Sequence, residues 1–361
     1  EGSGLRFEAG GAGPAQGSAR CSMEGDRAWE PASQQVAPPV AVGVLVEART
    51  GAPVPPTLVL RDSHFTGPYE RAVRVRGGGM VRLEGACFQG PQVALSQEGG
   101  LAEVERARAS GGTGPAFLTV EGTLKLVDVR VQGHEYGVTT NRARLSVRGF
   151  TSEHAQRAGL GLTATSGLLE DVVVKDAGTY GALQLTNSDL EVRRFRLEGS
   201  REYGVVALQG RLRLRDGRIT GVSTADGIAG DGLHLRQVDA DVESVAVHGV
   251  KGTCVLATQR AHVVLRDARL SACEFAALAA DTHATLEARG IEVHDAGGSV
   301  LLALEEGQLR AEALTVKNTR SALVSADCEG QTRVQLRQVD ARNTQGVEAP
   351  CVQWEPLPRR P

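Results

Sequence analysis

Two groups of residues in this sequence carry side chains suited to acid–base or metal chemistry. The first group is a pair of short pieces, His134-Glu135 and Glu153-His154, with Tyr136 directly after the first piece. A histidine beside a carboxylate can act as a general base or as two ligands of a metal ion. His134, Glu135, Glu153 and His154 are therefore the catalytic candidates, and polar turn residues are the alternative explanation.

The second group consists of carboxylates that recur at intervals of about 23 residues: Asp281, Glu305 with Glu306, and Asp327. If the fold stacks them about 5 Å apart, they could share Ca²⁺ or work as an acid and a base. Asp281, Glu305 and Asp327 are thus the metal candidates. Ca²⁺ is the one cofactor considered, and polar turns are again the alternative.

An internal repeat of about 23 residues determines which elements hold these side chains. Each copy contains an octet with apolar residues at its first, third, sixth and eighth positions, seen most clearly at 124–131, 190–197 and 263–270. Period-2 alternation, a two-residue interruption and renewed alternation predict two short strands that meet at a corner. A third apolar stretch follows in each copy, for example at 181–185, so each repeat holds three strands and leaves no room for a helix.

The fifth residue of each octet supports the predicted corner. In nine of the thirteen copies it is Asp, Gly or Ser, which tolerate a left-handed or sharply bent backbone. The thirteen corner residues are Asp62, Gly85, Arg106, Asp128, Gly149, Asp171, Arg194, Asp216, Ser244, Asp267, Gly290, Ala313 and Gln338. The sequence therefore predicts an all-β solenoid, a parallel β-helix of about thirteen coils with three short strands in each.

Over residues 57–354 this repeat resembles the right-handed parallel β-helix proteins of the pectin-lyase-like superfamily. The piece Asp231-Gly232-Leu233-His234-Leu235 is similar to the Asp/Asn-Gly-Ile repeat of that superfamily. The resemblance implies the fold and its right-handed coil. Pectate lyases of the superfamily use an aspartate cluster with calcium, and polygalacturonases use paired aspartates with Gly-His-Gly and Arg-Ile-Lys motifs. None of these motifs occurs here, so no specific enzyme family is matched.

Both ends of the chain depart from the repeat. We expect residues 1–56 to form a Gly/Pro-rich N-terminal segment and cap, residues 57–354 to form the parallel β-helix, and residues 355–361 to form a C-terminal tail. A cap is needed because the first coil of a solenoid exposes an apolar end and unpaired backbone groups.

Aromatic and sulfur side chains recur in the turns of the repeat. Tyr136, Tyr180 and Tyr203 each precede a glycine, and they either stack inside the turns or form an exposed platform for sugar rings. The six cysteines are an even number, which is compatible with disulfides formed in an oxidising compartment. Cys254 with Cys273 and Cys328 with Cys351 fall in neighbouring coils, which leaves Cys21 with Cys87.

Charge is distributed unevenly over the three predicted strands. The outward fourth residue of the octet is charged in twelve of thirteen copies, whereas the segments of the third strand carry no charge. A charge-free sheet face is either covered or adhesive. The main prediction is therefore a non-enzymatic scaffold or adhesin of the cell envelope, or a secreted one, that binds another envelope protein or a second copy through this face. The alternative is a protein that binds or cleaves a polysaccharide, as lyases and hydrolases do.

Composition restricts the remaining classes. The chain has 361 residues and a net charge of -3, which gives no electrostatic footprint for nucleic acid. No apolar run reaches the roughly 18 residues of a transmembrane segment. Only four of its 40 basic residues are lysines, a bias typical of GC-rich bacterial genomes, and it begins at Glu1 without a methionine. We expect a secreted, periplasmic or outer-surface bacterial protein in mature form, with a lipid anchor left open.

Overall fold

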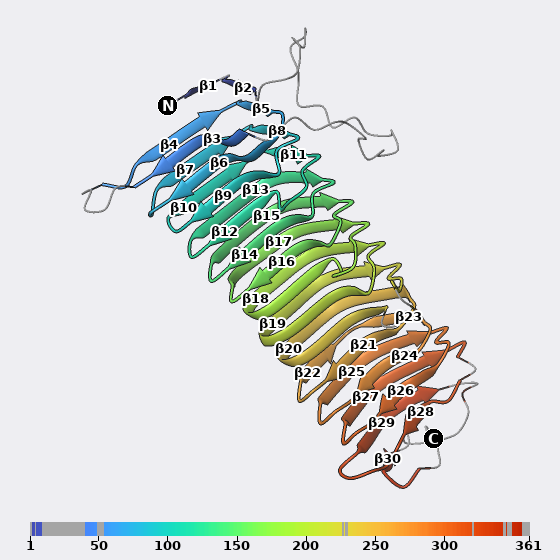
Figure 1. Cartoon of the computed structure of the whole chain (residues 1–361). Helices are drawn as coiled ribbons and strands as arrows, with labels where there is room; N and C mark the ends of the chain where they lie inside the picture. The colour runs from blue at the N-terminus through green and yellow to red at the C-terminus, as the bar shows by residue number, and fades with distance from the viewer. Residues whose placement is uncertain are drawn as a thin grey trace. The chain divides into compact units, whose positions relative to one another are not determined.

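The structure is a computed structural model that describes residues 2–3, 5–8, 40–48, 54–225, 227, 230–319, 321–341, 344 and 349–355. Within these ranges every regular element is a β-strand. The strands form a parallel β-solenoid of about twelve turns, which confirms the right-handed parallel β-helix and is close to the thirteen coils predicted (Figure 1). The chain divides into two compact units, Glu1–Ser152 and Glu153–Pro361, and each is described by itself.

The first unit builds three faces from strands that pair in parallel. Face A, which holds the first half of each octet, contains β1 (Gly2–Ser3), β4 (Thr57–Arg61), β7 (Met80–Glu84), β10 (Leu101–Glu105) and the start of β13 (Thr123–Gln132). Face B, which holds the second half, contains β2 (Arg6–Glu8), β5 (His64–Thr66), β8 (Cys87–Gln89), β11 (Arg108–Ser110) and the end of β13. Face C holds the third strand and contains β3 (Val40–Glu47), β6 (Tyr69–Arg76), β9 (Val93–Glu98), β12 (Phe117–Val120) and β14 (Tyr136–Asn141).

The second unit repeats the same three faces. Faces A and B are formed by β17 (Ser166–Lys175), by the later parts of β18 (Leu183–Glu198), β19 (Tyr203–Thr220) and β20 (Asp231–Val250), and by β22 (His262–Arg266), β23 (Arg269–Cys273), β25 (Thr285–His294), β27 (Gln308–Lys317), β29 (Arg333–Ala341) and β30 (Val352–Glu355). Face C is formed by β16 (Ala158–Thr163), the first residues of β18, β19 and β20, and then β21 (Thr253–Thr258), β24 (Ala276–Ala280), β26 (Ser299–Ala303) and β28 (Val324–Ala326). The remaining strand, β15 (Arg144–Glu153), runs up to the division between the units.

The corner between faces A and B has the backbone that the sequence predicts. All thirteen corner residues have a positive φ, from 48° at Asp62 to 74° at Gly149. At Gly85 the φ is 66°, and a Cβ added there would lie 2.4 Å from Oδ1 of Asp62 in the preceding coil. An aspartate in one coil and a glycine in the next therefore fit together at this corner.

Inward side chains of the three faces fill the interior with small and medium apolar groups. In the first unit, the rings of Phe7, Phe65 and Phe88 stack with centroid distances of 4.6 and 4.9 Å. Because Phe7 belongs to β2, the ladders already include residues of the segment that the sequence assigns to an N-terminal cap. Burial of such alternating residues drives the coiling.

Two disulfides join neighbouring turns of the second unit. Cys254 is bonded to Cys273 and Cys328 to Cys351, with Cα–Cα distances of 5.4 and 5.3 Å, which matches the pairs expected from the repeat. Cys87 is buried and disulfide-bonded, and Cys21 lies outside the described residues. Disulfides are typical of proteins that fold in an oxidising, extracytoplasmic compartment. The described part of the chain contains no helix long and apolar enough to cross a membrane.

Candidate functional site

The first catalytic candidate, His134, is a core residue of the first unit. Its side chain is fully buried, and Nδ1 lies 3.1 Å from the carbonyl oxygen of Gly114. Burial lowers the pKa of His134 to about 4, although hydrogen bonds to the backbone at Gly114 and Gln92 act in the opposite direction. Glu135 and Tyr136 beside it are partly exposed. A neutral, enclosed imidazole of this kind supports packing and has no surface on which to meet a ligand.

The second pair, Glu153 and His154, belongs to the other unit and is described there. Glu153 forms an ion pair with Lys175, whose Nζ lies 3.0 Å from Oε1. His154 is at a corner with a φ of 53°, and its Nδ1 lies 3.5 Å from Oδ2 of Asp176. Both pairs link neighbouring coils at the surface, as exposed ion pairs in a parallel ladder do.

The carboxylates proposed for a metal form a hydrogen-bonded turn. The hydroxyl of Thr282 lies 3.1 Å from Asp281 and 3.0 Å from Glu305, and the Glu305 amide donates to Asp327 at 2.7 Å. Burial acts to raise the pKa of Asp327, but hydrogen bonds from the backbone at Glu305 and from Thr332 outweigh it, so that the pKa is lowered. Across the ranges that the structure describes, no three His, Cys, Asp or Glu side chains are grouped so that they could hold a metal ion.

A polar groove of about 540 Å³ crosses face A of the second unit. Its four arginines each have a carboxylate partner within 4 Å in a neighbouring coil. The pairs are Arg266–Asp241, Arg289–Glu312, Arg310–Glu287 and Arg337–Glu355. Since these charges neutralise each other, the arginines of the groove offer little free charge to a ligand, and such exposed pairs contribute only about 0–1 kcal/mol each.

Face C of the second unit contains a histidine–carboxylate pair that is not among the candidates predicted from the sequence. Nδ1 of His234 lies 2.8 Å from Oδ2 of Asp231, and the two side chains are 14% and 7% exposed. A carboxylate at this distance accepts a hydrogen bond from Nδ1–H, which leaves the lone pair on Nε2. The pair therefore has the arrangement of an oriented general base.

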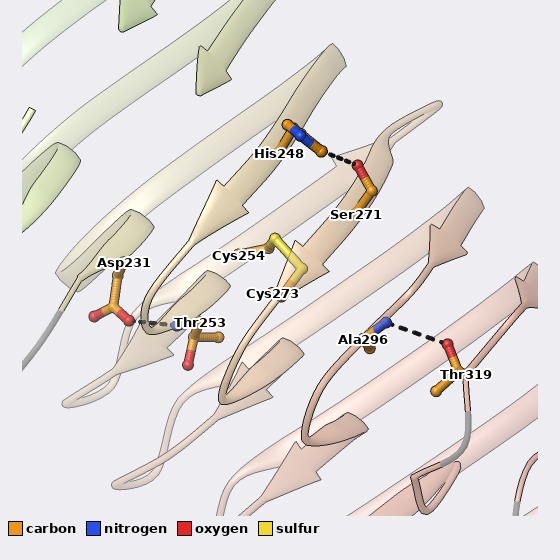
Figure 2. Close-up of a disulfide and its surroundings, with 8 residues drawn as sticks. All are labelled: Asp231, His248, Thr253, Cys254, Ser271, Cys273, Ala296 and Thr319. Carbon is orange, nitrogen blue, oxygen red and sulfur yellow. Dashed lines mark hydrogen bonds between the residues drawn. A yellow bond between two sulfur atoms is a disulfide. The ribbon is translucent and has the colours of Figure 1, made fainter. Parts of the chain in front are cut away.

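The second oxygen of the Asp231 carboxylate is held by the next coil. Oδ1 accepts a hydrogen bond of 2.7 Å from the backbone amide of Thr253, the first residue of β21 (Figure 2). Asp231 is itself the first residue of β20, where the chain turns onto face C. Its carboxylate is thus fixed from both sides, which leaves His234 little freedom to rotate.

Tyr203 and Arg236 complete this cluster, which we call the His234 site. The ring of Tyr203 meets the imidazole edge-on, with centroids 5.0 Å apart. Burial raises the pKa of Tyr203, the charges of Glu202 and Asp231 act in the same direction, and Arg236 opposes them. Arg236 lies two residues after His234 on the same strand, about 7 Å along it, and its buried Nε has no hydrogen-bond partner among the described residues.

The three candidate tyrosines have different surroundings and do not form one stack. Tyr136 lies in the first unit, Tyr180 is 39% exposed with Arg157 5.6 Å from its ring centre, and Tyr203 packs on His234. The one sequence signal for this pair is that Asp231 and His234 both occur in the piece that resembles the superfamily repeat. Their spacing argues against a pairing, since strict alternation places residues i and i+3 on opposite faces of a strand.

These features define a right-handed parallel β-helix protein. No protein-family model matches the chain, and neither does any curated protein sequence. Among solved structures, the chain is similar to the catalytic unit of a GH87 alpha-1,3-glucanase from Streptomyces thermodiastaticus strain HF3-3, with 11% identity, 78% of this chain and 64% of that chain covered, and a TM-score of 0.33. The chain thus spans less than two thirds of that catalytic unit.

The chain is also similar to two other solved structures. The receptor-binding domain of the siphovirus 9NA tailspike is 10% identical, with 84% of this chain and 74% of that chain covered and a TM-score of 0.45. The A-module of the mannuronan C-5 epimerase AlgE4 from Azotobacter vinelandii is 11% identical, with 84% and 91% covered and a TM-score of 0.36. At this level the likeness concerns the fold alone.

Proposed function

We propose that the protein binds an acidic polysaccharide at face C of the second unit and removes a proton from one of its uronate units. The observation that carries this proposal is the Asp231–His234 hydrogen bond of 2.8 Å at a partly exposed position of the sheet. A carboxylate-oriented imidazole can act as a general base, and the His234 side chain keeps 14% of its surface exposed. This corresponds to the polysaccharide alternative raised from the sequence.

A protein-binding scaffold is less well supported by the same face. Among the described residues, the face C strands of the second unit carry no exposed large apolar side chain; their outward positions are polar, small or half-buried. Stable protein interfaces need a well-packed apolar centre. A polar surface that binds one sugar unit fits these exposures better.

Arg236 favours a uronate as the bound sugar. A base removes the proton at C5 of a uronate only if the negative charge that develops on the neighbouring carboxylate is stabilised. Arg236 is the cation beside His234, two residues further along β20, and the residue is partly exposed. A guanidinium suits a carboxylate because it can donate two parallel hydrogen bonds.

The proposed reaction is a β-elimination. Nε2 of His234 takes the C5 proton, the electrons of that C–H bond form a double bond between C4 and C5, and the bond from C4 to the glycosidic oxygen breaks. The leaving oxygen takes a proton from the hydroxyl of Tyr203, which is protonated at neutral pH like that of an ordinary tyrosine. The products are a shorter chain and a chain with an unsaturated end.

The test compares the wild-type protein with His234→Gln on a panel of acidic and neutral polysaccharides. We expect unsaturated ends from the acidic polymers alone, and a loss of turnover of about 10²- to 10⁴-fold in the variant. His248→Gln is the matched control, because His248 lies on the same strand but on face B, where it bonds Ser271 at 2.9 Å. Full turnover in His234→Gln, or retention of a polymer without any turnover, would refute the proposed proton transfer.

A further inference from the structure

The Cys254–Cys273 disulfide lies directly beside the hydrogen bond that fixes Asp231 (Figure 2). Both cysteines are fully buried. The corner between β20 and β21 runs from Val250 to Cys254, and both of its ends are tied to Cys273 of the next coil. Val250 pairs with Cys273 in the ladder of face B, and Cys254 is bonded to it covalently.

This corner carries the amide that orients the Asp231 carboxylate. Thr253 directly precedes Cys254, and its N–H donates to Oδ1 of Asp231 at 2.7 Å, while Oδ2 of the same carboxylate accepts from His234 at 2.8 Å. The preceding residue, Gly252, donates to the carbonyl oxygen of Gly230 at 2.9 Å, next to Asp231. A continuous set of bonds therefore leads from the disulfide to the imidazole.

We infer that the Cys254–Cys273 disulfide is a positioning element for His234. By closing the corner it fixes the Thr253 amide, which holds the Asp231 carboxylate in the plane that His234 needs. The consequence for catalysis rests on the proposed function, whereas the consequence for the imidazole does not. The disulfide thus holds the His234 site in place, and a chain without it has a less firmly oriented His234 imidazole.

The second disulfide supplies a matched control. Cys328–Cys351 closes a loop of 23 residues, against 19 residues for Cys254–Cys273, so the removal of either bond frees a similar amount of chain entropy. Among the described residues, the hydrogen bonds to the Asp231 carboxylate come from Thr253 and His234 and involve neither Cys328 nor Cys351. A general loss of stability will therefore affect the protein whichever disulfide is removed. A loss of positioning of His234 will follow only from removal of Cys254–Cys273.

The experiment uses the full chain with Cys254→Ala and Cys273→Ala, and the same change at Cys328 and Cys351. The first readout is the imidazole Nδ1–H proton of His234 in the ¹H–¹⁵N spectrum, assigned by its absence in His234→Gln. We expect this signal to broaden into exchange in the first double variant and to persist in the second. On an acidic polysaccharide we expect kcat to fall about 10- to 100-fold in the first variant with KM little changed.

An unchanged Nδ1–H signal and an unchanged kcat in the Cys254→Ala, Cys273→Ala variant would overturn the inference. If that variant does not fold, Cys254→Ser with Cys273→Ser repeats the test of the disulfide. Thr253→Pro tests the link from the amide to Asp231 by itself, because it keeps the disulfide but removes the amide proton at the first residue of a strand. If the Nδ1–H signal is lost in the disulfide variant but His234→Gln keeps full turnover, the disulfide positions His234 and the proposed function is wrong. The experiment therefore distinguishes a failure of the positioning from a failure of the proposed function.

Discussion

At the scale of single residues, two histidines show how the position in a coil sets the chemistry of a side chain. His134 points into the core, where burial lowers its pKa to about 4. His234 lies on the outer surface of face C and is held by Asp231 at 2.8 Å. The first is suited to packing and the second to proton transfer.

The buried His134 makes stability depend on pH. Its pKa in the folded chain, about 4, is below the ordinary value of 6.5, so the unfolded chain takes up the proton first as the pH falls. This contribution is therefore complete above pH 6.5 and is lost as the pH falls towards 4, by about 3 kcal/mol in all. Urea titrations at several pH values should show this slope for the wild type and a shallower one for His134→Gln. Equal slopes for the two proteins would contradict the assignment.

Arg236 should determine which polymers are accepted. With Arg236→Gln, we expect KM for an acidic polysaccharide to rise about tenfold or more, because a charge-assisted hydrogen bond to a carboxylate contributes about 1.5–3 kcal/mol. Arg269→Gln is the control, since Arg269 lies on face B and already pairs with Glu292 at 3.3 Å. The measurement is the KM of both variants on the same acidic polymer. An equal change in KM for Arg236→Gln and Arg269→Gln would show that Arg236 does not bind the polymer.

At the scale of elements, the corners between faces A and B are where sequence and structure agree best. A left-handed residue at a fixed place in a repeat is a local requirement, and Asp62, Gly85 and Asp128 satisfy it because their residue types tolerate a positive φ. The Asp231–His234 pair could not be predicted in this way. It depends on a turn at the start of β20 and on an amide from β21, neither of which leaves a periodic signal.

One corner can be improved by a single change. Ala313 has a φ of 54°, a conformation in which a Cβ costs about 1–2 kcal/mol. Ala313→Gly should therefore stabilise the protein by about 0.5–1 kcal/mol, after the greater entropy of glycine in the unfolded chain is taken into account. Chemical denaturation measures this gain. Ala311→Gly is the control, because Ala311 is buried within β27 and its replacement should destabilise; a loss of stability in both variants would argue against strain at this corner.

At the scale of the whole molecule, the repeat period and the three strands per coil could be predicted because every coil satisfies the same pattern of inward apolar residues. Part of the first coil could not, since β2 lies in a Gly/Pro-rich stretch without an octet and is placed by pairing with β5. The function was harder to predict from the sequence than the first coil. A net charge of -3 gives no hint of a site for an acidic polymer, because one arginine beside one histidine does not change the composition.

Proton removal from a uronate by His234 is tested most directly by ¹H NMR of an acidic polysaccharide incubated with the full chain. We expect new olefinic signals from unsaturated chain ends with the wild type and with His248→Gln, and none with His234→Gln. Olefinic signals that persist in His234→Gln, or their absence with the wild type across the acidic polymers tested, would contradict it.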